Sequence, residues 1–240
     1  MAHPVTRRER LRAETVLEIQ STARKLLVAE GWEGLSLRAI ARAMGMSAPA
    51  LYRYYGSREE LVAALVAALK VEMTEALERA RDNAPNLGSK LLETSRAFRA
   101  WAVAHPAEFT LIFASPVIGL DRPSATNLTN LTEDRFSGVF GTLIAELYLT
   151  RPFPIPSDHE IEAPLAQQLS AWCETFPFPL PLGLTQVFLS CWIRLYGVVS
   201  MEAFNQLKFA LTDASAMFEV ELRGLARLLG IEDWYTPPKS

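Results

Sequence analysis

The chain contains few residues of the kinds that build disulfide scaffolds, metal centres and hydrolytic sites. Its 240 residues include two cysteines, Cys173 and Cys191, and three histidines. The cysteines match no metal-ligand spacing, and so few cysteines favour a reduced, intracellular protein. No G-x-S-x-G sequence and no glycine-rich phosphate loop is present. The sequence therefore predicts no catalytic site, no bound metal and no cofactor.

Membrane and export signals are also scarce. The charged start "MAHPVTRRERLRAET" has no apolar stretch after its arginines, so we expect no signal peptide. The longest apolar stretch is 182–204, close to the roughly 20 residues of a membrane span. Gln186, Ser190 and Arg194 recur every four residues along it and mark one polar helical face. We interpret the stretch as a buried helix of a cytoplasmic protein.

Basic residues are concentrated near the N-terminus although the net charge is −3. Residues 1–58 carry ten Lys and Arg against five Glu, whereas residues 59–240 carry fourteen against twenty-two acidic residues. A basic head on an acidic body favours a head that meets a polyanion. Chance placement of solvated charges is the alternative.

The hydrophobic pattern is helical, with no convincing alternation of the strand type. It predicts an all-α protein, with a three-helix domain at 1–61, a connecting helix over 58–82, and a helical bundle at 83–240. The expected helices are 12–30, 37–44, a short one after Ser47, 58–82, 89–104, 106–114, 124–150, 160–175, 182–209 and 213–229.

Local signals set the helix ends in the head. Ser36 is the expected N-cap of the first short helix, because its hydroxyl can accept from a free first-turn amide. "GMS" at 45–47 interrupts the chain, and Ser47 begins a second short helix that we expect to end at Gly56. "SREE" at 57–60 is a capping box for the long helix that follows.

Two short helices joined by "GMS" have the proportions of a helix-turn-helix unit, whose second helix enters the major groove of DNA. Small residues at its start permit close approach, and hydroxyls and cations suit phosphates and base edges. The predicted DNA-contacting residues are Ser36, Arg38, Ser47, Ala48, Ala50, Tyr52, Arg53, Tyr54 and Arg58. The predicted packing residues of the same unit are Leu37, Ile40, Ala41, Leu51 and Tyr55.

The run "LSLRAIARAMGMSAPALYRYYGSREEL" resembles the DNA-binding domain of the TetR family of bacterial regulators. The resemblance rests on a spaced hydrophobic frame together with Gly45, Ser47, Leu51, Tyr52, Tyr55, Ser57, Arg58 and Glu60. The chain departs from the pattern at Tyr54, where members often carry histidine, and at Arg58, where lysine is usual. The resemblance implies an all-helical fold, a ligand-responsive repressor and a homodimer formed through the last two long helices, here 182–209 and 213–229.

The C-terminal segments "FRAWAVAHPAEFTLIFASPV" and "WIRLYGVVSMEAF" are similar to the WHG type of regulatory domain. Trp101, His105, Pro106 and Gly197 carry that likeness. The residues predicted to line a pocket for a largely apolar small molecule are Trp101, Phe109, Phe113, Trp172, Phe188 and Trp192. Each of these aromatic residues also suits a plain hydrophobic core. The predicted dimer-forming face of helix 182–209 consists of Leu184, Val187, Phe188, Cys191, Leu195 and Val198.

These observations predict a transcriptional regulator that binds a palindromic operator as a homodimer and responds to a small effector. A repressor is favoured over an activator. Two other classes stay open: a small-molecule enzyme on a helical scaffold, which would lack any visible acid–base or nucleophile set, and a protein-interaction module whose helix-turn-helix no longer reads DNA.

Overall fold

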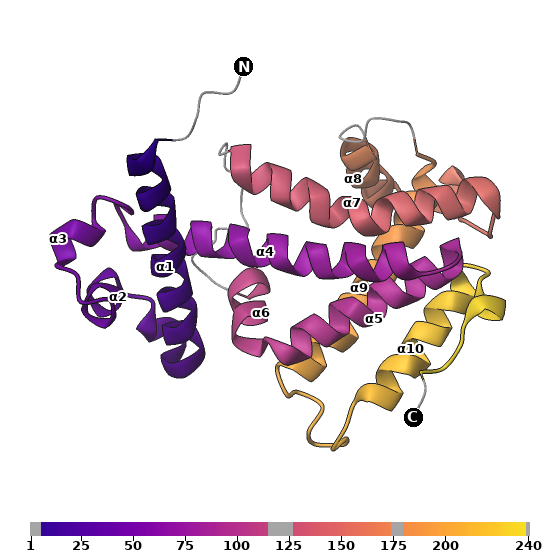
Figure 1. Cartoon of the computed structure of the whole chain (residues 1–240). Helices are drawn as coiled ribbons and strands as arrows, with labels where there is room; N and C mark the ends of the chain where they lie inside the picture. The colour runs from indigo at the N-terminus through magenta and orange to yellow at the C-terminus, as the bar shows by residue number, and fades with distance from the viewer. Residues whose placement is uncertain (1–5, 115–126, 174–179, 239–240) are drawn as a thin grey trace. The chain divides into compact units, whose positions relative to one another are not determined.

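The computed structural model describes residues 6–114, 127–173 and 180–238, and the regular structure in these ranges is helical (Figure 1). The predicted all-α class is confirmed. The α-helices are α1 (Arg7–Glu30), α2 (Leu37–Ala43), α3 (Ala48–Leu51), α4 (Arg58–Asn83), α5 (Leu87–Ala104), α6 (Pro106–Phe113), α7 (Asn127–Thr150), α8 (Ala163–Cys173), α9 (Leu182–Ala203) and α10 (Ser215–Leu228).

The chain forms two compact units. The first unit comprises Met1–Glu72 and His105–Glu133, and the second comprises Met73–Ala104 and Asp134–Ser240. Helix α4 therefore contributes to both units, and α6 belongs with the N-terminal helices although α5 precedes it in the chain. The functional domain bounds expected from the sequence, 1–61 and 83–240, stay a prediction.

Several helix ends follow from the predicted local signals. The Ser36 hydroxyl accepts a hydrogen bond from the Ala39 amide at 3.1 Å and caps α2. Helix α1 ends at Gly31, whose φ of 68° lies in the left-handed region that glycine adopts without strain. Its start, expected at residue 12, lies at Arg7, because Thr6 and Glu9 form a capping box one turn earlier.

Three further predicted bounds were wrong. Helix α9 ends at Ala203, six residues before the expected end, because Asn205 has a φ of 58° and turns the chain out of the helix. Helix α8 begins at Ala163, because Asp158–Glu160 closes a separate 3-10 turn first. Helix α3 ends at Leu51 and not at Gly56. The expected start at 124 and the end at 175 lie outside the described residues.

An aromatic cluster forms part of the core of the second unit. Phe98 of α5 has no exposed surface, and its ring centroid lies 6.1 Å from that of Phe136 and 5.6 Å from that of Trp192. Around this core, Arg96 and Arg99 of α5 pair with Glu219 and Glu202 of the C-terminal helices. Helices α5, α7 and α9 are thus joined by apolar contact, with ion pairs at the edge.

Helix α9 packs on α5, α8 and α10 within the second unit. Most of the face that we predicted to form a dimer is turned inward instead. Leu184, Val187, Cys191 and Leu195 are buried within the chain, whereas Phe188 and Val198 are half-buried. Helical periodicity marks an apolar stripe but does not say which neighbour covers it. Among the described residues, α9 is long and apolar enough to cross a membrane, and 39% of its apolar window is already buried.

Gly183 at the start of α9 allows a close backbone approach. A Cβ built there would lie 2.0 Å from the carbonyl oxygen of Pro156, whereas one built on Gly141 of α7 would meet nothing within 4 Å. We expect Gly183→Ala to lower the free energy of unfolding by about 1–3 kcal/mol, as overpacking does. Gly141→Ala should raise it by about 0.5–1 kcal/mol through helix propensity. Chemical denaturation of both variants tests this pair, and equal effects would contradict it.

Candidate nucleic-acid interface and cavity

Helices α2 and α3 form a helix-turn-helix in the first unit. The turn between them passes through Gly45, which has a φ of 67°, and is closed by a hydrogen bond from the Met46 amide to the Ala41 carbonyl at 2.9 Å. Ser47 occupies the N-cap position of α3 as predicted, and Pro49 lies in the first helical turn. The Ser47 side chain makes no capping hydrogen bond to that turn.

The inner face of this unit is apolar, as the sequence indicated. The predicted packing residues Leu37, Ile40, Ala41, Leu51 and Tyr55 are all buried. The Tyr55 hydroxyl accepts a hydrogen bond from the Gln20 amide of α1 at 3.0 Å, and burial raises the pKa of this phenol. The helix-turn-helix is therefore fixed against α1 by a packed face that includes one satisfied polar group.

The outer face fully exposes four of the nine predicted DNA-contacting residues. Arg38, Ser47, Tyr52 and Arg53 are exposed, with 48% of Tyr52 accessible. Ser36, Ala48, Ala50, Tyr54 and Arg58 are partly buried. Because α3 has only four residues, Tyr52, Arg53 and Tyr54 lie in the turn after it. A hydrogen bond of 2.8 Å from the Tyr54 amide to the Leu51 carbonyl closes this turn.

Arg12 of α1 reaches this turn. Its guanidinium donates to the Arg53 carbonyl at 3.4 Å, and its central carbon lies 5.2 Å from the centroid of the Tyr54 ring. The contact links the first turns of α1 to the end of the helix-turn-helix. Sequence reasoning did not select Arg12, because the contact joins residues 41 positions apart.

Arg58 makes contacts that the sequence did not predict. Its guanidinium donates to the Trp32 carbonyl and stacks on the Trp32 ring at 4.3 Å from the centroid. The capping box also differs in detail: Ser57 caps the Glu60 amide at 3.1 Å, but the Glu60 carboxylate accepts from the Gly56 amide and not from that of Ser57. Arg58 thus ties the start of α4 to the loop after α1.

A charged cluster joins α1, α4 and α6. Arg24 donates to Glu72 at 2.7 Å and to Glu108 at 2.9 Å. The Glu108 side chain is 5% exposed, so breaking this pair would leave a buried carboxylate without its partner. All three residues belong to the first unit, which also contains the helix-turn-helix.

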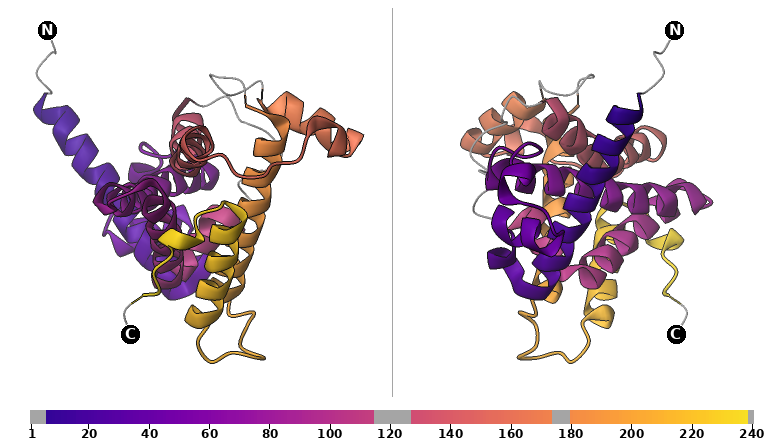
Figure 2. Two further views of the ribbon diagram at one scale, coloured as in Figure 1. Left: turned by 90° about the vertical axis from the view of Figure 1, so that its right-hand side faces the viewer. Right: turned by 60° about the vertical axis from the view of Figure 1, so that its left-hand side comes forward.

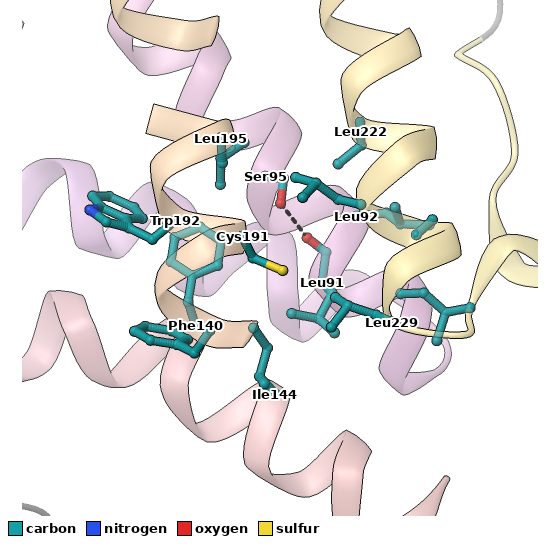
Figure 3. A pocket seen from close by; sticks show the side chains of 14 residues that line it. Leu91, Leu92, Ser95, Phe140, Ile144, Cys191, Trp192, Leu195, Leu222 and Leu229 are labelled. Carbon is teal, nitrogen blue, oxygen red and sulfur yellow. Dashed lines mark hydrogen bonds between the residues drawn. The ribbon is translucent and has the colours of Figure 1, made fainter. Parts of the chain in front are cut away.

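The second unit contains a small apolar cavity of about 40 Å³ (Figure 3). It lies among α5, α7, α9 and α10, and no charged side chain lines it. The polar groups of its lining side chains are the Ser95 hydroxyl, which already donates to the Leu91 carbonyl at 2.8 Å, the Trp192 indole N–H and the Cys191 thiol. Burial raises the pKa of that thiol to about 11, so it stays protonated at neutral pH. The wall accordingly favours a neutral, apolar occupant.

The predicted pocket residues divide among several places. Phe188 and Trp192 line the cavity. Trp172 lies behind them, with its ring centroid 5.8 Å from that of Phe188, and Trp101 is buried at 5% exposure elsewhere in the second unit. Phe109 and Phe113 pack on each other at 4.7 Å in the first unit. Aliphatic lining residues from α7 and α10, such as Ile144 and Leu222, were missed because nothing distinguishes them from ordinary core residues.

Within residues 6–114, 127–173 and 180–238, no group of three or more His, Cys, Asp or Glu side chains is placed to hold a metal ion. Glu108, three residues after His105, is paired with Arg24.

Two segments of the chain match known families. Residues 19–65 match the family described as "Bacterial regulatory proteins, tetR family", and residues 91–225 match "Tetracyclin repressor-like, C-terminal domain". The first segment contains the helix-turn-helix described above. The second contains the cavity-forming helices α5, α7 and α9 and most of α10.

Relatives and solved structures cover nearly the whole chain. The HTH-type transcriptional regulator Rv1816 of Mycobacterium tuberculosis is 32% identical over 231 residues, which are 94% of this chain and 96% of the relative. The crystal structure of the protein SCO4313 is 30% identical with a TM-score of 0.71, covering 92% of this chain and 98% of that one. A transcriptional regulator of the TetR/AcrR family from Thermobifida fusca YX-ER1 shares the fold at a TM-score of 0.58 and 17% identity, over 88% and 96% of the two chains.

Proposed function

This chain belongs to the TetR family of helix-turn-helix transcriptional regulators, and we propose that it is a cytoplasmic, ligand-responsive repressor that binds a palindromic operator as a homodimer. The family is one of regulators and not of enzymes, which removes the enzymatic alternative. The predicted WHG type of the C-terminal domain stays a prediction beside the matched tetracyclin-repressor-like family.

One observation supports DNA contact by the predicted residues: the outer face of the helix-turn-helix carries exposed cations and hydroxyls that the rest of the unit does not use. Arg38 on α2 and Arg53 after α3 lie on either side of the turn, and Tyr52 extends its phenol beside them. Arginines position a protein on phosphates, and hydroxyls donate to phosphate oxygens without a full charge. A helix-turn-helix that had lost DNA binding would have no need for this set.

We expect Arg38→Gln to weaken binding to every duplex and to reduce the slope of log K against log salt by about 0.9, the value for one phosphate contact. The matched control is Arg79→Gln, which removes the same charge from an exposed site on α4 in the second unit. Fluorescence anisotropy across a salt series measures both variants. An Arg38 variant with the wild-type slope would remove this residue from the interface.

Arg58 requires separate treatment, because its guanidinium already serves Trp32. Lysine at this position keeps the charge but cannot provide the planar stacking group. If Arg58 also contacts phosphate, Arg58→Lys should keep the wild-type slope of log K against log salt but have a lower melting temperature. Arg58→Ala should have both a smaller slope and a lower melting temperature.

Dimerisation is supported by the outward face that α9 and α10 present within the second unit (Figure 2). Ile193 on α9 and Val220 on α10 are 61% and 62% exposed, and the Arg194–Glu221 ion pair bridges the same two helices. The other exposed apolar side chains on these helices are Met201, Met217 and Leu228. A contiguous apolar face on a two-helix layer suits an isologous contact with a second copy.

Gly197 of α9 gives a second reason to place a dimer contact on this face. It lies between Ile193 and Met201 along α9, and a Cβ built on it would meet no atom of its own chain within 4 Å. Glycine in a helix interior costs about 0.5–1 kcal/mol relative to alanine. A partner helix that approaches closely at Gly197 would explain why no side chain is present there.

We therefore expect Gly197→Arg to produce monomers, because it introduces a bulky charge at the centre of the proposed contact. Leu149→Arg is the control, since Leu149 on α7 is 80% exposed and away from this face. Light scattering at several protein concentrations separates the two results. A monomeric wild type, or dissociation by both variants, would contradict the assignment of the face.

Effector binding is supported by the apolar cavity between α5, α7, α9 and α10. Pockets for drug-sized ligands enclose about 300–1,000 Å³, so a cavity of about 40 Å³ must widen to admit such a molecule. The wall contains no charged side chain, and its hydrogen-bonding groups are the Cys191 thiol, the Trp192 indole N–H and the Ser95 hydroxyl, which already donates to the Leu91 carbonyl. A charged effector would lose its hydration there without compensation, so we assign the site to neutral, apolar compounds.

A filled cavity should abolish the response to such compounds. Ala226 of α10 lines the cavity and is 1% exposed, whereas Ala100 of α5 is on the surface. We expect Ala226→Leu to keep DNA affinity but to lose the rise in melting temperature that neutral apolar compounds give to the wild type. Ala100→Leu should respond normally. Carboxylate analogues of the same size serve as the negative ligand set, and stabilisation by these alone would refute the assigned class.

A further inference from the structure

One face of helix α1 changes character along its length. Its C-terminal part is apolar and packs against the rest of the first unit, whereas its N-terminal part is basic and exposed. Ile19, Ala23 and Leu27 recur every four residues and are buried against the rest of the first unit. Arg8 and Arg12 continue the same stripe toward the N-terminus: at 100° per residue, both lie within about 20° of Ile19 around the helix axis. Both are exposed.

The change from apolar to basic coincides with the edge of the helix-turn-helix. The first turns of α1 project beyond α2 and α3 in Figure 1. Arg12 lies at that edge, where it contacts the Arg53 carbonyl and the Tyr54 ring. Arg8 is one turn further out on the same side, about 6 Å along the axis at 1.5 Å per residue. The stripe therefore runs directly on from the residues proposed to contact DNA.

The charge of this stripe is not neutralised locally. Glu9 is the one acidic residue between positions 6 and 13, and its carboxylate is turned back to accept from the Thr6 amide at 2.7 Å and from the Thr6 hydroxyl at 2.8 Å. The capping box that uses Glu9 also holds these turns in the helix. The arginines are thus presented on a rigid rod, and not on a free arm.

We infer that Arg8 and Arg12 extend the DNA-binding surface beyond the helix-turn-helix and hold two phosphates of the duplex backbone. This inference rests on the proposed DNA binding. The contact is to phosphate and carries no base preference, so it raises affinity for all sequences alike. Arg10 lies about 200° from Arg12 around the axis, on the opposite face of α1, and takes no part.

The test compares three glutamine variants of the full-length protein that remove identical charges from one helix. In the Arg8→Gln/Arg12→Gln double variant, the slope of log K against log salt should fall by about 1.8, for two phosphates. Affinity for a preferred and for an unrelated duplex should fall by the same factor. Arg8→Gln alone should lower the slope by about 0.9 without disturbing the contact of Arg12 with Tyr54. Arg10→Gln should leave the slope close to that of the wild type.

Each outcome discriminates. A wild-type slope in the double variant, or an equal loss in Arg10→Gln, overturns the inference while leaving DNA binding by the helix-turn-helix intact. A loss confined to the preferred duplex overturns it as well, because it would mean base contact. If the wild-type protein binds no duplex at any salt concentration, the proposed function itself fails. Melting temperatures of the variants within the wild-type range exclude loss of folding as the cause.

Discussion

The first unit depends on the pairing of Arg24 with Glu72 and Glu108. A carboxylate as buried as that of Glu108 is costly without a partner, and removing one member of such a buried pair typically costs about 3–5 kcal/mol. The Arg24 side chain is 30% exposed, so the cost here is at the lower end or below it. The pairing nevertheless fixes three helices from distant parts of the sequence. It explains why α6 forms one unit with the DNA-binding helices.

This arrangement changes how the path between the two proposed sites is understood. The sequence suggested that the long helix over 58–82 is the one covalent element touching both functions. The structure adds α6, which follows α5 of the second unit and belongs to the first. Glu72 is the last residue of α4 in the first unit, and Glu108 lies in the first turn of α6. Arg24 therefore contacts both segments, α4 and α6, close to the points where the chain passes from one unit to the other. Arg24 lies on α1, the helix that also carries Arg12.

Predictability from the sequence followed the range of the interaction. Ser36, Gly31 and the packing of Leu51 and Tyr55 were correct because each depends on a few neighbouring residues or on one periodic stripe. The stacking of Arg58 on Trp32 and the pairing of Arg24 with Glu108 join residues 26 and 84 positions apart, and no local pattern encodes them. The inward face of α9 was misassigned for the same reason: periodicity gives the stripe, but only the fold gives its neighbour. The cavity is the hardest feature to predict from the sequence, because its aliphatic lining residues are of the same types as ordinary core residues. They differ only in leaving a space between them.

The distribution of ion pairs explains how a chain with a net charge of −3 can present a cationic surface. In the described part of the second unit, arginines are largely matched within the chain: those at 96, 99, 135, 151, 194, 223 and 227 each contact a carboxylate. In the first unit Arg24 is matched in this way, whereas Arg8, Arg38 and Arg53 are exposed beside the helix-turn-helix. Charges paired at contact distance cancel within a few ångströms, and salt screens the remainder over about 8–10 Å. The arginines paired in the second unit therefore contribute little positive charge to their surroundings, and the cationic surface beside the helix-turn-helix comes from Arg8, Arg38 and Arg53.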